Sequence, residues 1–147
     1  MYARELFLGG ADRDFLEAEN YFQMQVASPD RSGDEITEGC CVAAKAARLR
    51  GDAVSFFKYT SKVIAGDGCS EICCELGHFY EETGDFEEAA VWYYNAAYET
   101  QPVLALRSSE EEPLQGLIRC YEQLGLPAQA RSYAEELKHR QNEQTDN

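Results

Sequence analysis

The chain has 147 residues, of which 13 are basic and 27 acidic, for a formal net charge of −14. This length can bury the core of one domain without covalent cross-links. The acidity argues against a protein that binds nucleic acid or an anionic membrane, because both need basic patches. No apolar run approaches the roughly 20 residues of a membrane span, and the N-terminus carries no secretory segment. We therefore expect a cytoplasmic protein with no membrane partner.

The first elements are short. Residues 2–8 are predicted as the tail of a helix whose beginning is absent, and Gly9-Gly10 ends it. A second helix is expected to start near Asp14, with Phe15, Ala18 and Phe22 on its packing face. Residues 28–34 contain a proline and a glycine among polar residues, which predicts a loop.

Two helical hairpins are expected next. In the first, helices over 35–50 and 53–64 meet at Gly51-Asp52; in the second, helices from about 70 and 86 meet at Thr83–Asp85. A glycine can adopt the left-handed conformation past a helix end, and the aspartate after it can cap the next helix. The same corner recurring after 33 residues indicates a repeat.

A last hairpin follows residues 102–110, which lengthen the repeat interval. Ser109, three glutamates and Pro113 predict a helix start with proline in the first turn. The closing helix opens at Pro127, with Ala130, Ala134 and Leu137 facing inward, and residues 141–147 are expected to be a disordered tail. No segment alternates as a strand would, so the fold class is all-α.

Residues 76–96 alternate small and large side chains, as closely crossing helices require. This stretch resembles the tetratricopeptide repeat (TPR). The signature positions are Leu76, Gly77, Tyr80, Gly84, Ala89, Tyr93 and Ala96, with Tyr121, Gly125 and Ala130 in the last repeat. The resemblance implies one domain over 1–140, a right-handed helical-hairpin solenoid of seven to eight helices. Its repeats would be a truncated one in 1–30 and whole ones at about 34–67, 69–102 and 111–140.

In the TPR register, first-helix residues that point away from the packing face line a concave groove. The candidate partner-binding residues are Lys45, Arg48, Cys74, His78, Glu82, Gln115 and Arg119. Their mixed charges suit a peptide segment or a neighbouring domain, and the alternative is that they form ordinary solvated helix faces. Some TPR domains clamp a partner's C-terminal carboxylate. Cys41 and Cys74 stand where that clamp's leading lysine or asparagine would be needed, so we expect no clamp.

We expect no catalytic residue, metal or cofactor. Asp12-Arg13-Asp14 has the form that holds a metal and a sugar nucleotide, but it precedes a helix, where aspartate is a common cap. His78 and His139 have no nucleophile at a suggestive spacing. The six cysteines show no Cys-x-x-Cys spacing and are interpreted as reduced thiols at small-residue positions.

A second resemblance comes from the order of several features. Tyr-Ala-Arg-Glu-Leu stands at residues 2–6, followed by the Gly51-Asp52 corner, residues 70–77, residues 92–97 and, after the insert, residues 120–125. This order is similar to the C-terminal TPR region of bacterial family 2 glycosyltransferases. The insert at 102–110 departs from that family, because it is shorter and lacks glycine and aromatic residues.

The second resemblance implies a non-catalytic accessory module of a sugar-transferring parent enzyme. Such a module would position an acceptor, pair two protomers as a homodimer, or contact the catalytic domain of the same parent chain. The alternative is a free-standing scaffold that binds a peptide in its groove. A chain that begins inside a helix favours the fragment over the scaffold, because natural arrays begin with a capped repeat.

Overall fold

The computed structural model describes residues 2–8, 15–27, 33–66, 68–104 and 108–145. Across these ranges the chain is helical and contains no strand, which confirms the predicted all-α class. The elements are α1 (Tyr2–Leu8), α2 (Phe15–Ala27), α3 (Gly33–Arg50), α4 (Ala53–Ile64), α5 (Ser70–Glu82), α6 (Phe86–Tyr94), the π-helical turn η2 (Asn95–Glu99), α7 (Ser108–Gln123) and α8 (Pro127–Thr145). Asp12–Asp14 and most of the predicted 28–34 loop lie outside the described residues.

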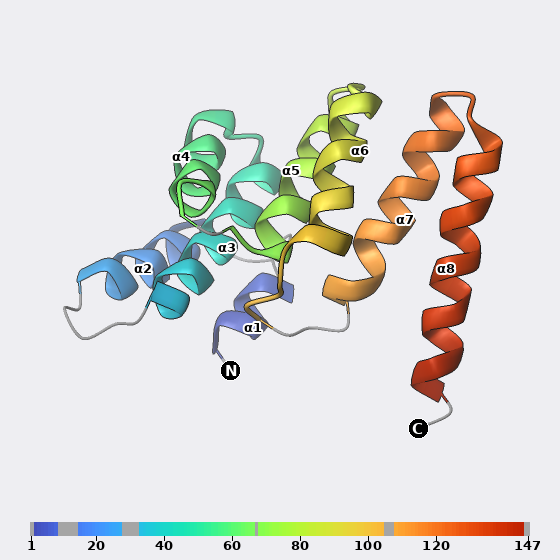
Figure 1. The fold of residues 1–147 in the computed structure, drawn as a ribbon. Helices are drawn as coiled ribbons and strands as arrows, with labels where there is room; N and C mark the ends of the chain where they lie inside the picture. The colour runs from blue at the N-terminus through green and yellow to red at the C-terminus, as the bar shows by residue number, and fades with distance from the viewer. Residues whose placement is uncertain (1, 9–14, 28–32, 67, 105–107, 146–147) are drawn as a thin grey trace.

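Helices α3 to α8 form three consecutive hairpins, each made of two neighbouring antiparallel helices (Figure 1). The corners contain Gly51, Gly84 and Gly125 with φ angles of 83°, 86° and 74°, a conformation that residues with a Cβ rarely adopt. After the first two corners an aspartate caps the next helix: Asp52 Oδ1 accepts from the Ser55 N–H and Asp85 Oδ1 from the Glu88 N–H. The predicted left-handed corners and both caps are therefore confirmed.

The second and third hairpins interlock through one side chain. Tyr93 of α6 is completely buried between Gly77 of α5 and Gly116 of α7. A Cβ atom built on Gly77 would lie 2.6 Å from the Tyr93 ring, and one on Gly116 would lie 2.5 Å from it. Real Cβ atoms do not approach a ring so closely, so both positions require glycine while the ring stays where it is.

The N-terminal half of the core contains several packed aromatic pairs. Phe56 of α4 is fully buried and stacks on Phe79 of α5, with ring centroids 5.0 Å apart. Phe22 of α2 packs edge-on against Tyr59 of α4 at 4.7 Å, and α1 contributes Leu6 and Phe7 to the same cluster. Aromatic pairs of this kind add to the stabilisation that burial provides.

Three predictions are corrected. Helix α8 continues to Thr145, so residues 141–145 are helical rather than a disordered tail. Ala134 is exposed instead of facing inward, because α8 packs through Ala130, Tyr133 and Leu137, and Ala134 lies at the edge of that face. Helix α7 begins at Ser108, which places Pro113 in its second turn rather than its first. Among the described residues, no helix combines the length and the apolar character that a membrane crossing needs.

Candidate functional site

Helix α5 lies between α3 and α7 (Figure 1), and most of the predicted partner-binding residues on these three helices bond to side chains of the same chain. Arg48 of α3 donates from Nε to Glu75 Oε2 at 2.6 Å and from Nη1 to Glu82. The Glu75 side chain is only 3% exposed. Burial acts to lower the pKa of Arg48, but the two carboxylates outweigh it and the pKa ends above its ordinary value. Arg48 therefore neutralises a buried carboxylate of its own chain.

Arg119 of α7 is also paired. Its Nε and Nη2 donate to the two carboxylate oxygens of Glu81, at 2.7 and 3.0 Å, and Tyr93 Oη donates to Glu81 Oε1 at 2.6 Å. The hydrogen bond with Glu81 raises the pKa of Arg119. Burial acts to raise the pKa of Glu81, but the bonds from Arg119 and Tyr93 outweigh it and the pKa falls below 4.5. Arg48 and Arg119 thus serve the α3–α5 and α5–α7 contacts.

His78 is half-buried, although its position on the helix predicted an outward side chain. Its Nδ1 lies 2.7 Å from Tyr93 Oη and its Nε2 lies 3.2 Å from Glu112 Oε2 on α7. Cys74 Sγ lies 3.7 Å from His78 Nε2 and 3.8 Å from Glu112 Oε2. Burial, followed by the charge of Glu112, raises the pKa of the Cys74 thiol well above its ordinary value. The hydrogen bond with His78 lowers the pKa of Glu112.

Cys74, His78 and Glu112 are one of two groups of potential metal ligands among the described residues. The sequence does not predict this group, because Glu112 lies 38 residues beyond Cys74. The available signal was the spacing of Cys74 and His78, which are four residues apart and so share a helix face.

The second group joins Cys41 of α3, Cys69 just before α5, and Glu71 of α5; all three are buried, and the two sulfur atoms lie 3.7 Å apart. Glu71 is already used by the fold: its two carboxylate oxygens accept from the backbone N–H groups of Val103 and Leu104, at 2.9 and 2.7 Å. Burial raises the pKa of Cys41 well above its ordinary value. Glu71 and Cys41 therefore belong to the interior of the protein.

The two remaining candidates differ from each other. Lys45 Nζ lies over the Phe7 ring, 4.3 Å from its centroid, so this cation contacts α1. Gln115 of α7 is exposed. Of the seven predicted partner-binding residues, four are used in pairs between helices, Cys74 is buried, and Lys45 packs on an aromatic ring.

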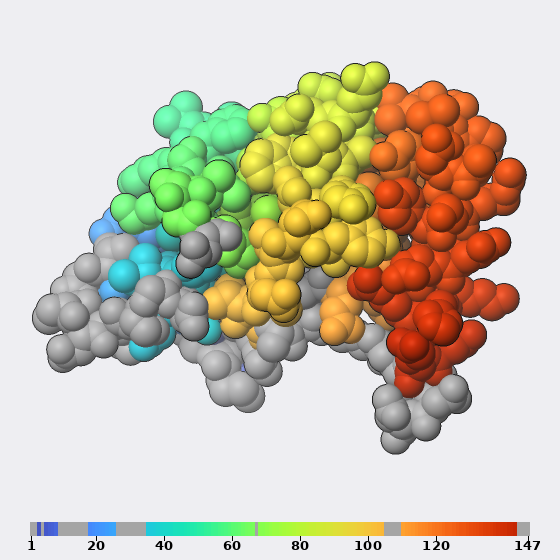
Figure 2. Space-filling model, viewed as in Figure 1, coloured from blue at the N-terminus to red at the C-terminus, as the bar shows by residue number. Residues whose placement is uncertain are grey.

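A surface hollow lies between α6, the end of α7 and the start of α8. It measures about 520 Å³, and its lining includes Val91, Tyr94, Tyr121, Leu126 and Tyr133. Val91, Tyr94 and Leu126 are 55%, 41% and 40% exposed, which is high for large apolar side chains. Figure 2 shows the surfaces of α6 and η2, in yellow to gold, meeting that of α8, in red. We call this feature the α6–α8 hollow.

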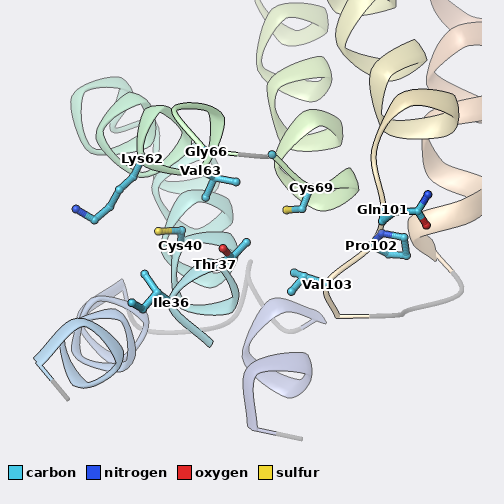
Figure 3. A pocket seen from close by; sticks show the side chains of 11 residues that line it. Ile36, Thr37, Cys40, Lys62, Val63, Gly66, Cys69, Gln101, Pro102 and Val103 are labelled. Carbon is cyan, nitrogen blue, oxygen red and sulfur yellow. The ribbon is translucent and has the colours of Figure 1, made fainter. Parts of the chain in front are cut away.

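A second cavity of about 530 Å³ lies between α3, the end of α4 and the segment that follows η2 (Figure 3). Cys40 and Cys69 border it, and the Lys62 side chain extends away from both thiols. Burial raises the pKa of Cys40 to about 11, so its thiol is protonated at neutral pH. A protonated thiol is a poor nucleophile, and this cavity therefore offers little to covalent catalysis.

Comparisons of the chain with protein-family models, with curated proteins and with solved structures found no match.

Proposed function

We propose that this chain is a non-catalytic protein-interaction module of the TPR type, which holds another folded domain against its α6–α8 hollow. The repeat class is supported by the three hairpins with a left-handed glycine at each corner. It is also supported by Tyr93, which lies between two glycines as small and large residues alternate in that repeat. The right-handed solenoid is part of the same proposal.

The observation that carries the interaction role is the α6–α8 hollow. Contiguous exposed apolar surface, rimmed by polar groups, is typical of protein–protein contact sites. Here Val91, Tyr94 and Leu126 are exposed beside the stacked rings of Tyr121 and Tyr133, whose centroids lie 5.6 Å apart. Tyrosine is enriched at such interfaces, because it buries a large ring and keeps a hydroxyl for a polar partner.

The face formed by α3, α5 and α7 is a weaker candidate for the same role. A peptide held there would have to compete with the pairs that Arg48 and Arg119 make with glutamates. The negative charge of the chain nonetheless favours this face for a second candidate function, which is a scaffold that binds a basic peptide. The chain carries a net charge of −14, and the carboxylates of Glu82 and Glu122 are exposed on this face.

For the occupant of the hollow we propose the catalytic domain of a bacterial family 2 glycosyltransferase, joined to this module in one cytoplasmic parent protein. The support is the order of sequence features from Tyr2 to Gly125 that resembles the C-terminal region of those enzymes. The non-catalytic role is supported by the thiols of Cys40 and Cys74, which burial keeps protonated.

Site-specific photo-crosslinking in cells tests this proposal. A photoreactive phenylalanine analogue replaces Tyr94 in the hollow, and in a matched variant it replaces Gln115 on α7. We expect the first variant to crosslink to a domain that mass spectrometry identifies as a family 2 glycosyltransferase, and the second to give no such product.

Two outcomes would overturn the assignment of the hollow to a catalytic domain. Crosslinks from position 115 to a basic peptide segment, with none from position 94, would favour the scaffold. Crosslinks from position 94 to a second copy of this chain would make the hollow a homodimer interface, which light scattering of the purified chain would confirm.

A further inference from the structure

The three side chains around His78 have the spacing of a zinc site. Cys74 Sγ, His78 Nε2 and Glu112 Oε2 form a triangle with sides of 3.7, 3.8 and 3.2 Å. Around a tetrahedral zinc ion, with bonds of about 2.3 Å to sulfur and 2.0–2.2 Å to nitrogen and oxygen, ligand atoms lie roughly 3.3–3.6 Å apart. The observed sides differ from these separations by a few tenths of an ångström.

The hydrogen bonds of Tyr93 show which nitrogen of His78 faces the triangle as an acceptor. Glu81 can only accept, so the single Tyr93 hydroxyl proton is donated to Glu81 Oε1, 2.6 Å away. Tyr93 Oη then accepts from Nδ1–H of His78, at 2.7 Å. In the neutral imidazole, Nε2 is left with a lone pair that faces the Glu112 carboxylate at 3.2 Å. The hydrogen bond between His78 and Glu112 therefore needs a second proton, on Nε2, and a metal cation can take the place of that proton.

We propose that Cys74, His78 and Glu112 bind a zinc ion that joins α5 to α7. A thiolate, an imidazole and a carboxylate together suit Zn²⁺ better than Mg²⁺ or Ca²⁺, which prefer oxygen ligands alone. Binding releases the Cys74 proton to solvent, and the thiolate and the carboxylate then balance the two charges of the ion. Because the Glu112 side chain is 41% exposed, water can supply the fourth ligand.

Tyr93 and Glu81 form a chain of hydrogen bonds on the side of His78 that faces away from the proposed zinc ion. A metal-bound histidine usually donates its other N–H to a fixed acceptor, which holds the ring in orientation. Here Nδ1–H donates to Tyr93, and Tyr93 donates to Glu81, which Arg119 holds in turn. Tyr93 is thus a positioning residue for the zinc ligand His78.

The group at Cys41, Cys69 and Glu71 is a poorer site. Both carboxylate oxygens of Glu71 already accept backbone N–H groups, from Val103 and Leu104. A metal there would compete with both hydrogen bonds, in a place where all three side chains are buried. A substitution in this second group, Cys41→Ser, is therefore compared with Cys74→Ser in the test below.

The test is a titration of the reduced, metal-free protein with Zn²⁺ against a chromophoric chelator, and with Co²⁺ followed by absorption. We expect one Zn²⁺ per chain, and a near-ultraviolet thiolate-to-cobalt band on Co²⁺ binding. Cys74→Ser should abolish that band, and His78→Asn and Glu112→Gln should weaken zinc binding. Tyr93→Phe should weaken it by about 10- to 100-fold, as the loss of an orienting partner does elsewhere.

Matched controls are Cys73→Ser, a buried thiol next to Cys74, and His139→Asn, the other histidine; both should bind as the wild type does. Zinc should also raise the thermal unfolding midpoint of the wild type, but not that of Glu112→Gln. Because the Glu112 side chain is 41% exposed, we expect the Glu112→Gln variant to fold. The proposal is overturned if Glu112→Gln and the wild type bind zinc alike. It is equally overturned if Cys41→Ser, rather than Cys74→Ser, removes the cobalt band.

Discussion

The phenol ring of Tyr93 lies against the backbone of Gly116, so close that a Cβ on Gly116 would be 2.5 Å from the ring. A Cβ on Gly77 would lie 2.6 Å from the same ring, so the ring also contacts the backbone of α5 closely. One tyrosine therefore sets the separation of α5, α6 and α7. The same ring carries the hydroxyl that links His78 to Glu81.

Replacing Gly116 by alanine should destabilise the protein. Alanine is the better helix former by about 0.5–1 kcal/mol, but the overlap with Tyr93 should cost more, so we expect a net loss of about 1–3 kcal/mol. Urea denaturation measures the free energy of unfolding. Gly66→Ala is the matched control: its new Cβ would have 3.6 Å to the nearest atom, and we expect a gain of about 0.4–1 kcal/mol. A stabilised Gly116→Ala variant would show that Tyr93 moves freely.

At the central corner, Gly84→Val should destabilise through the backbone alone. Gly84 has a φ of 86°, and nothing lies within 4 Å of a Cβ built there, so no steric clash contributes. A β-branched residue strains in this conformation, and we expect a loss of about 1–3 kcal/mol. Gly84→Asn should lose less, because asparagine tolerates the left-handed region. Equal losses in the two variants, measured by thermal unfolding, would contradict this explanation.

Removing the Arg48 side chain should destabilise the protein, because the buried Glu75 carboxylate would lose its charged partner. In Arg48→Met the carboxylate loses its charged partner while it stays 3% exposed, so we expect a loss of about 3–5 kcal/mol. The double variant Arg48→Met/Glu75→Leu should recover most of this stability, because no charge is then left buried. Glu82→Gln, at the exposed end of the same network, should change stability by no more than about 1 kcal/mol. Additive losses in the double variant would mean that Arg48 and Glu75 are not coupled.

Glu81 should make the free energy of unfolding decrease as the pH falls into the acidic range. Its pKa in the folded protein lies below 4.5, its ordinary value, so its contribution is complete above that value and is lost as the pH falls through the folded pKa. Between about pH 6 and pH 3, the free energy of unfolding of the wild type should fall more steeply than that of Glu81→Gln, by up to about 1.4 kcal/mol per pH unit. Glu87→Gln, at an exposed site on α6, should keep the wild-type slope. Parallel curves for the wild type and Glu81→Gln would refute the assignment.

The parts of the fold that the sequence predicts well depend on neighbours along the chain. The corners at Gly51, Gly84 and Gly125 follow from a glycine after a helix, and the caps at Asp52 and Asp85 from a residue three positions before the bonded N–H. These are local rules, which hold whatever the rest of the chain does.

The parts of the fold that the sequence does not predict depend on contacts between residues far apart in the chain. Arg48 and Glu75 are 27 residues apart, and Cys74 and Glu112 are 38 apart. Helical periodicity places such residues on a face but does not say which face of another helix will meet it. The groove residues were therefore predicted as available to a partner, whereas Arg48, His78 and Arg119 are used within the chain.

Glu71 has a consequence for how the chain folds during synthesis. The carboxylate of this α5 residue accepts hydrogen bonds from the backbone N–H groups of Val103 and Leu104, and Ser70, beside it, bonds to Thr100 and Gln101. The first turn of α5 therefore cannot complete its native bonds until Leu104 has left the ribosome. Helical hairpins that depend on local contacts can form one after another as they leave the ribosome. The α5–α6 hairpin, however, must wait for the segment that connects it to α7.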